Sequence, residues 1–249
     1  LLLTGAGPPP EPPLLPGDEA AKARFYHHCL DLATSAPEQA QAMAKRWEEA
    51  GGGFPARHCS AAALIGLKHF AEGAEQLQTL AAAMMLAPIE MRANSFDQAG
   101  QAWLMANRPA EAEGAFNSAL DLRPDDPDFL VDRARALFDE EAYNAAIADL
   151  DRAAELTPGR AEIFLYRATA YRAEQDFAKA RHDLDEALRL SPNNPGVLLE
   201  RGNLSRLTGD LAGARRDWKA IIAGNPADDP NVTAAKANLV KLKNVDPNP

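Results

Sequence analysis

Apolar and polar positions in the middle of the chain repeat with a spacing of 34 residues. Four segments of similar pattern each end in proline, at Pro124, Pro158, Pro192 and Pro226. Proline stops a helix, and the polar residues that follow it suit a turn. The pattern before each proline reads as helix, short turn and helix. The sequence therefore predicts four helix pairs, at residues 93–126, 127–160, 161–194 and 195–228.

Positions are counted from the first residue of each 34-residue unit. Small residues occupy three positions of each unit, and a bulky apolar residue occupies a fourth. Position 8 holds Gly100, Ala134, Ala168 and Gly202; position 20 holds Ala112, Ala146, Ala180 and Ala214; position 27 holds Ala119, Ala153, Ala187 and the larger Ile221. Position 24 holds Phe116, Leu150, Leu184 and Trp218. Small residues let two helices approach closely, and the bulky ones fill the seam between them. Because one such pair does not bury its apolar side, the pattern predicts a stack of pairs, a solenoid.

These positions resemble the tetratricopeptide repeat family, including its bacterial members. The resemblance covers Ala93 to Asp228 without insertion, and Ser205 at position 11 and Ile221 at position 27 depart from it. It implies an all-α fold, a right-handed α-solenoid of stacked antiparallel helix pairs.

The flanks of the repeats are expected to extend the stack. Residues 54–92 read as a degenerate unit whose second helix runs several residues long before Pro88. Residues 18–53 are expected to form an N-terminal helical cap, and residues 229–249 a capping helix and tail. Residues 1–17 form a proline-rich segment, which is typical of extended, unpacked chain.

Composition favours close-packed helices and excludes several classes of function. The chain is 46% hydrophobic, 25% charged and only 6% aromatic. It has no apolar run long enough to span a bilayer, and its net charge of −10 disfavours binding to nucleic acid. It contains no glycine-rich phosphate loop, no HExxH and no paired CxxC. We therefore expect no catalytic residues and no cofactor.

Histidine and cysteine residues gather in two places, His27–Cys29 and His58–Cys59. Adjacent helical residues point about 100° apart, so the first group does not converge on one ion, and we expect no metal site. Cys29 and Cys59 either form a disulfide or remain two buried thiols. Leu1–Gly7 is either the remnant of a signal peptide or an ordinary tail. A signal peptide would place the protein in the bacterial periplasm or outside the cell, and otherwise it would be cytoplasmic.

Two charged positions occur together or not at all. Position 7 holds Arg133, Arg167 and Arg201, and position 23 holds Asp149, Asp183 and Asp217. The unit at Ala93 has alanine at both places, Ala99 and Ala115. We interpret these residues as structural ion pairs between helices; the alternative is that the arginines bind an anionic ligand.

The family resemblance implies a binding groove lined by the first helix of each unit. The groove residues expected on that basis are Gln101, Leu104, Arg135, Phe138, Leu165, Thr169, Arg172, Leu199, Asn203 and Arg206. Arg135, Arg172 and Arg206 would form a basic track suited to an acidic or C-terminal peptide. Alternatively they pair with Asp139, Glu200 or other neighbours and bind nothing. No unit has the lysine at position 5 and asparagine at position 9 with which some family members grip a chaperone tail.

The sequence thus predicts a non-catalytic adaptor that binds a peptide or helix of another protein. The alternative is a self-assembling scaffold, a homo-oligomer formed by stacking of solenoids. An enzyme or metal carrier built on the histidine and cysteine residues is a third, weaker hypothesis.

Overall fold

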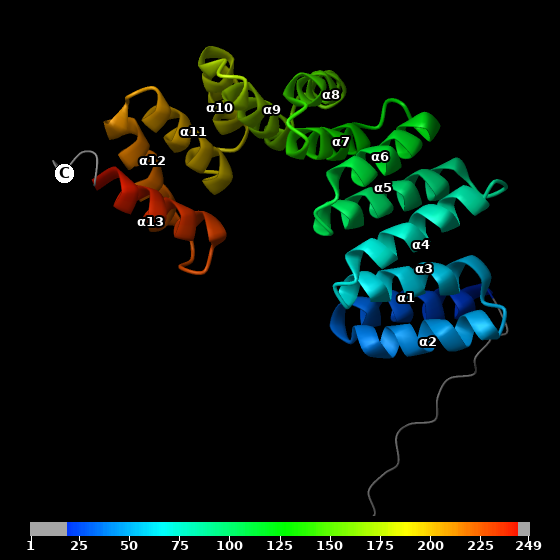
Figure 1. Ribbon diagram of the computed structural model, residues 1–249. Helices are drawn as coiled ribbons and strands as arrows, with labels where there is room; N and C mark the ends of the chain where they lie inside the picture. Colours follow the sequence, from blue (N-terminus) through cyan, green and yellow to red (C-terminus); the bar gives the residue numbers. More distant parts are fainter. Residues whose placement is uncertain (1–18, 244–249) are drawn as a thin grey trace, which may run out of the picture. The chain divides into compact units, whose positions relative to one another are not determined.

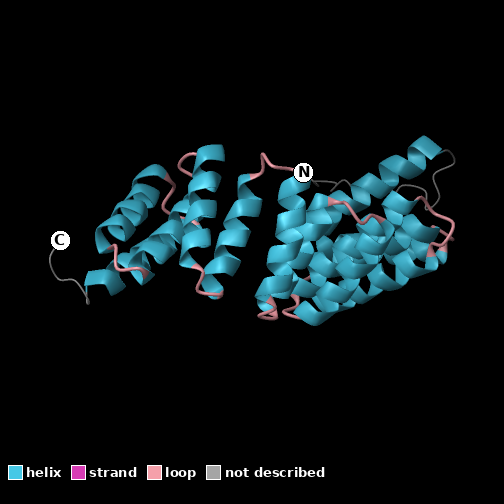
Figure 2. Ribbon diagram, turned by 90° about the horizontal axis from the view of Figure 1, so that it is seen from above, coloured by secondary structure: helices cyan, strands magenta, loops and turns pink. Residues whose placement is uncertain are grey.

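The computed structural model describes residues 19–243, and within them the chain is a series of α-helices without a strand (Figures 1 and 2). It divides into two compact units, an N-terminal unit that ends at Arg108 and a C-terminal unit that begins at Pro109. The N-terminal unit contains α1 (Glu19–Ser35), α2 (Pro37–Glu49), α3 (Gly53–Gly66), α4 (Phe70–Ala83) and α5 (Ile89–Met105). The C-terminal unit contains α6 (Pro109–Leu122), α7 (Pro127–Asp139), α8 (Tyr143–Leu156), α9 (Ala161–Ala173), α10 (Phe177–Leu190), α11 (Pro195–Leu207), α12 (Leu211–Gly224) and α13 (Pro230–Lys243).

The fold is an all-α helical-repeat solenoid, as the sequence predicts. The segments 127–160, 161–194 and 195–228 correspond to the pairs α7–α8, α9–α10 and α11–α12. The boundary between the two units falls inside the segment 93–126, between α5 and α6.

Local chemistry explains where the helices begin. Asp126 accepts hydrogen bonds from the backbone N–H groups of Asp128 and Phe129 at the start of α7, where Pro127 occupies the first turn. Asn194 caps α11 in the same way, again before a proline. Such caps satisfy N–H groups that have no partner within the helix.

The turn inside each helix pair repeats one backbone geometry. Five residues at the same position of successive pairs have positive φ angles: Lys68 (64°), Asn107 (58°), Glu141 (61°), Gln175 (61°) and Gly209 (87°). Three residues beyond the last helical residue, a backbone N–H returns to a carbonyl of the last turn, as from Ala142 to Leu137 at 2.8 Å. This is the Schellman ending of a helix, and it fixes the antiparallel return of the chain.

The core follows the predicted small and bulky positions. The residues at position 24 are almost fully buried: Phe116 (0% exposed), Leu150 (1%), Leu184 (0%) and Trp218 (0%). Gly202 lies directly against Trp218, since a Cβ atom at Gly202 would be 2.5 Å from the indole Nε1. The two departures from the pattern are also buried. Ile221 packs in the core, and the Ser205 hydroxyl accepts a hydrogen bond of 2.9 Å from Arg181 Nη2.

The prediction of a long second helix before Pro88 is wrong. Helix α4 ends at Ala83 and has the length of α6, α8, α10 and α12, because Met84 leaves the helical conformation (ψ 49°). The additional residues lie in the connection 84–88 and in an extra first turn of α5, which begins at Ile89 directly after Pro88. Proline favours this arrangement, since it fits just before a helix and does not fit inside one.

Candidate peptide-binding site

A groove of about 380 Å³ in the C-terminal unit crosses α7, α9 and α11, the first helix of each of its three helix pairs. Its apolar lining includes Phe138, Leu165 and Leu199, one from each of these helices. Helix α8 contributes Ala146 and Leu150 to the lining. The charged and polar side chains of the lining are Arg135, Asp139, Tyr166, Thr169 and Glu200. The three helices are successive copies of one repeat position, so equivalent residues align along one surface. The volume is within the range of pockets that bind ligands in proteins.

The structure brings half of the expected groove residues together. Arg135, Phe138, Leu165, Thr169 and Leu199 line the groove of the C-terminal unit. Gln101 instead lines a separate groove of about 530 Å³ in the N-terminal unit, and Leu104 is half-buried in that unit. Each unit therefore has a groove of its own.

Two of the three arginines expected to form the basic track have carboxylate partners. Arg172 Nε donates a hydrogen bond to Glu200, which is 8% exposed. Arg135 Nη1 donates to Asp132 at 2.8 Å, so its partner is not Asp139. The alternative of intramolecular pairing thus describes Arg172 and Arg135 better than a free basic track does.

Arg206 is exposed and differs from the other two arginines because, within residues 19–243, it forms no ion pair. It lines a second pocket of the C-terminal unit, of about 260 Å³, together with Leu211, Asn238, Lys241 and Leu242. Lys241 is also exposed. Two cations therefore face one small pocket in a chain whose net charge is −10.

Asn203 connects this pocket to the larger groove. Its side chain accepts a hydrogen bond of 2.9 Å from Asn238 of α13 and donates one of 3.3 Å to Glu200. It lies between Leu199 and Arg206 on α11, which are seven residues, or about 10 Å of helix, apart. The contribution of α13 was missed by the sequence interpretation, although the position of Lys241 outside the apolar stripe of the helix was a usable signal.

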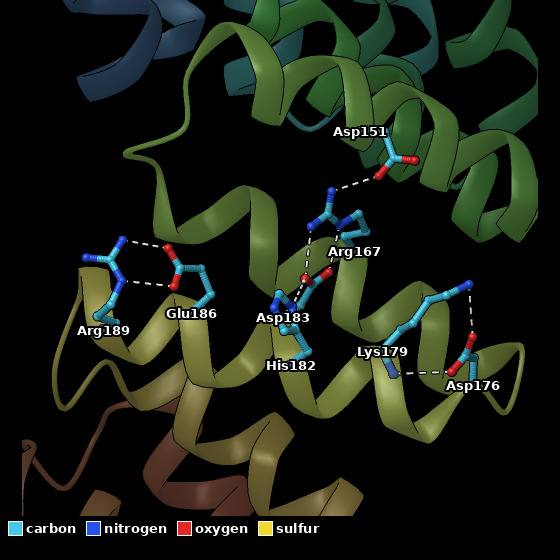
Figure 3. A network of polar contacts seen from close by, with 8 residues as sticks. All are labelled: Asp151, Arg167, Asp176, Lys179, His182, Asp183, Glu186 and Arg189. Carbon is cyan, nitrogen blue, oxygen red and sulfur yellow. Dashed lines mark hydrogen bonds and ion pairs between the residues drawn. The ribbon is translucent and has the colours of Figure 1, made fainter.

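The repeated arginines and aspartates form ion pairs with two hydrogen bonds each. Arg133 contacts Asp149 at 2.7 and 2.6 Å, Arg167 contacts Asp183 at 2.7 and 2.9 Å, and Arg201 contacts Asp217 at 2.8 and 2.7 Å. The hydrogen bonds that Arg167 donates to Asp183 raise the pKa of Arg167 above its usual value. Figure 3 shows Arg167 between Asp183 and a second carboxylate, Asp151.

This second partner is also repeated. Arg133 donates to Asn117 at 2.8 Å, Arg167 donates to Asp151 at 2.7 Å, and Arg201 Nη1 lies 3.9 Å from Asp185. All three partners occupy position 25 of the preceding unit. Each arginine therefore links the second helices of two successive units, a connection that sequence spacing alone did not indicate. The arginines are engaged within the stack, which leaves little of them for an anionic ligand.

The two cysteines and the histidines near them in the N-terminal unit do not gather at one site. Cys29 of α1 and Cys59 of α3 form a disulfide, with Cα atoms 6.0 Å apart. His58 is buried and lies between Tyr26 Oη (2.8 Å from Nδ1) and Gln98 Oε1 (2.7 Å from Nε2). Burial lowers the pKa of His58, although the Gln98 hydrogen bond opposes this. His27 and His28 are exposed, and residues 19–243 contain no group of three or more metal-ligating side chains.

Comparison with known proteins identifies the class of repeat. Sequence models of the tetratricopeptide repeat match residues 98–161 and 161–194. No curated protein matches the chain at a significant level. Together with the helix pairs, these matches identify residues 98–194 as tetratricopeptide repeats, a class of repeat that generally mediates protein–protein interaction.

Solved structures of low sequence identity share the fold. YrrB, described as a TPR protein with an unusual peptide-binding site, has a TM-score of 0.59 at 18% identity, covering 73% of this chain and 90% of YrrB. PilF of Pseudomonas aeruginosa has a TM-score of 0.61 at 14% identity, covering 88% and 99%. MamA of Desulfovibrio magneticus has a TM-score of 0.51 at 17% identity, covering 84% and 97%. In the described part of the chain, no helix combines the length and the apolar character that a membrane span requires.

Proposed function

We propose that the C-terminal unit binds a peptide or helix of another protein in the groove of α7, α9 and α11, as a non-catalytic adaptor. The observation that carries this proposal is the alignment of Phe138, Leu165 and Leu199 along one groove. Three apolar side chains at repeated spacing suit a ligand that presents apolar side chains at regular intervals. The charged groups at the sides of the groove suit the polar atoms of that ligand.

The pocket beside Arg206 and Lys241 is proposed to receive a carboxylate of that ligand. Both cations are exposed and have no carboxylate partner within residues 19–243, whereas Arg172 is held by Glu200. An acidic side chain or a C-terminal carboxylate is therefore the expected group at this end. The negative charge of the rest of the chain would keep such ligands from binding elsewhere.

Selection from a phage-displayed library of random peptides with free C-termini tests the proposal. Peptides enriched on the full chain are expected to combine apolar residues with a carboxylate. Leu165→Asp and Leu199→Asp, made together, are expected to remove their binding while helical content is retained. Val240→Asp is the matched control, because Val240 is 63% exposed and does not line the groove.

The carboxylate pocket is tested with one selected peptide, made as the free acid and as the C-terminal amide. The double variant Arg206→Glu, Lys241→Glu is expected to bind the free-acid peptide about tenfold or more weakly, with little change in its affinity for the amide. Equal effects on both forms would place the carboxylate elsewhere. Binding that survives the groove substitutions would refute the groove itself.

The disulfide supports a further proposal, that the protein works in an oxidising compartment such as the bacterial periplasm. The segment expected to be a signal-peptide remnant, residues 1–7, lies outside the described residues. Mass spectrometry of unreduced protein from its native compartment tests this. Recovery of a bridged Cys29–Cys59 pair is expected, and two free thiols would contradict it.

A further inference from the structure

Exposed apolar side chains cluster at one place in the N-terminal unit, in the connection from α4 to α5 and the extra turn of α5. We call residues 84–91 the apolar loop. Its exposed side chains are Met85 (76%), Leu86 (103%), Ile89 (52%) and Met91 (41%). Contiguous exposed apolar residues of this kind mark interaction surfaces in soluble proteins.

The fold does not require apolar residues here. The corresponding connections of later units are polar and proline-containing: RPDD at 123–126, TPGR at 157–160 and SPNN at 191–194. The apolar loop instead begins MMLAP at 84–88 and is followed by a helical turn that α7, α9 and α11 lack. It also ends the longest stretch of the sequence without Asp, Glu, Lys or Arg, Gln76–Ile89.

The same unit contains a groove whose lining lacks charge. The groove of about 530 Å³ is formed by α1, α3 and α5, with Leu77 from α4. Leu30, Ile65 and Met105 are among its apolar side chains, and its polar ones are Thr34, His58, Gln98 and Gln101. None of the lining residues is Asp, Glu, Lys or Arg, in contrast to the groove of the C-terminal unit. We call it the uncharged groove.

A groove without charged partners selects against charged ligands, because a charge removed from water there is not compensated. It therefore suits an uncharged apolar segment. Residues 84–89 of the apolar loop have this chemistry, while the acidic ligand expected at the C-terminal unit does not. Within residues 19–243, no part of the same molecule covers the Leu86 side chain, which is fully exposed.

We propose that the apolar loop of one molecule packs into the uncharged groove of a second copy. The groove lining lacks charged residues, and the apolar loop contains one, Glu90, in a chain that is 25% charged. Leu86, Met85 and Ile89 supply exposed apolar side chains for the groove. The proposed contact is head-to-tail, with the loop of each copy in the groove of the next, and it continues from copy to copy unless a ring closes. It is independent of peptide binding by the C-terminal unit.

Analytical ultracentrifugation of the full chain tests this over micromolar to submillimolar concentrations. The wild type is expected to gain mass with concentration. Leu86→Asp alters only the loop, and Met105→Asp alters only the rim of the groove, where Met105 is 56% exposed. Both residues are exposed, so both variants should fold. Each substitution is expected to weaken self-association about thirtyfold, and Val240→Asp is the matched control.

Mixing the two variants provides the discriminating result. The Leu86→Asp molecule keeps a working groove and the Met105→Asp molecule keeps a working loop, so the mixture should form a 1:1 heterodimer and stop there. The proposal is overturned if the wild type stays monomeric, if either variant associates like the wild type, or if the mixture stays monomeric.

Discussion

The cost of removing Arg167 measures how much the repeated ion pairs stabilise the stack. Arg167 joins Asp183 through two hydrogen bonds and Asp151 through a third. The Asp183 side chain is only 3% exposed and that of Arg167 15%. In Arg167→Met the Asp183 carboxylate stays buried, with His182 Nδ1 at 3.3 Å as its remaining side-chain contact. Removing one partner of a buried ion pair lowers the free energy of unfolding by about 3–5 kcal/mol. We expect a loss of about 3 kcal/mol here, because the contact with His182 compensates in part.

A loss of about 3 kcal/mol in Arg167→Met should lower the midpoint of thermal unfolding of a chain of this size by about 6–12 °C, measured by circular dichroism. Arg152→Met is the matched control, because Arg152 pairs with Asp125 and Glu155 at the surface, and its midpoint should equal that of the wild type. Arg167→Met with Asp183→Leu should recover most of the loss, since no carboxylate is then left buried. Equal midpoints for the Arg167 and Arg152 variants would refute the reasoning.

Three further predictions concern single features of the two units. Burial lowers the folded-state pKa of His58, so the imidazole binds a proton more readily in the unfolded chain. The free energy of unfolding should therefore fall as pH drops below about 6.5, by at most about 1.4 kcal/mol per pH unit. Denaturant titrations of His58→Gln should show a smaller dependence on pH. Cys29→Ser opens a bridge of sequence separation 30 and should cost about 3 kcal/mol, as should reduction of the wild type. Gly202→Ala forces the Trp218 indole to move and should cost about 1–3 kcal/mol, whereas Gly114→Ala, with open space around it, should stabilise by about 0.5–1 kcal/mol.

The repeat positions were predictable from sequence because local geometry dictates them. A small residue such as Ala146 or Ala180 is needed wherever two helices touch, and a proline is tolerated only at a helix boundary. The start of α5 was not predictable in the same way. The residues before Pro88 are good helix formers, so the sequence permits a longer α4, and tertiary packing decides the boundary.

Side-chain partners were predictable only where two charges occurred together. Arg167 and Asp183 did so in successive units. The sequence analysis named Glu200 among the alternative partners of the groove arginines, but no repeated pattern assigned it to Arg172, because the two residues pair once, across 28 positions. The approach of Lys241 to Arg206 depends on how α13 packs, which composition alone does not specify.

Hydrogen–deuterium exchange of the full chain, with and without a saturating library-selected peptide, tests the central claim most directly. The account predicts slower exchange in α7, α9 and α11, the helices that carry Phe138, Leu165 and Leu199. Helices α10 and α12 should change little. Protection confined to α10 and α12, or to the N-terminal unit, would contradict the assignment of the peptide-binding groove.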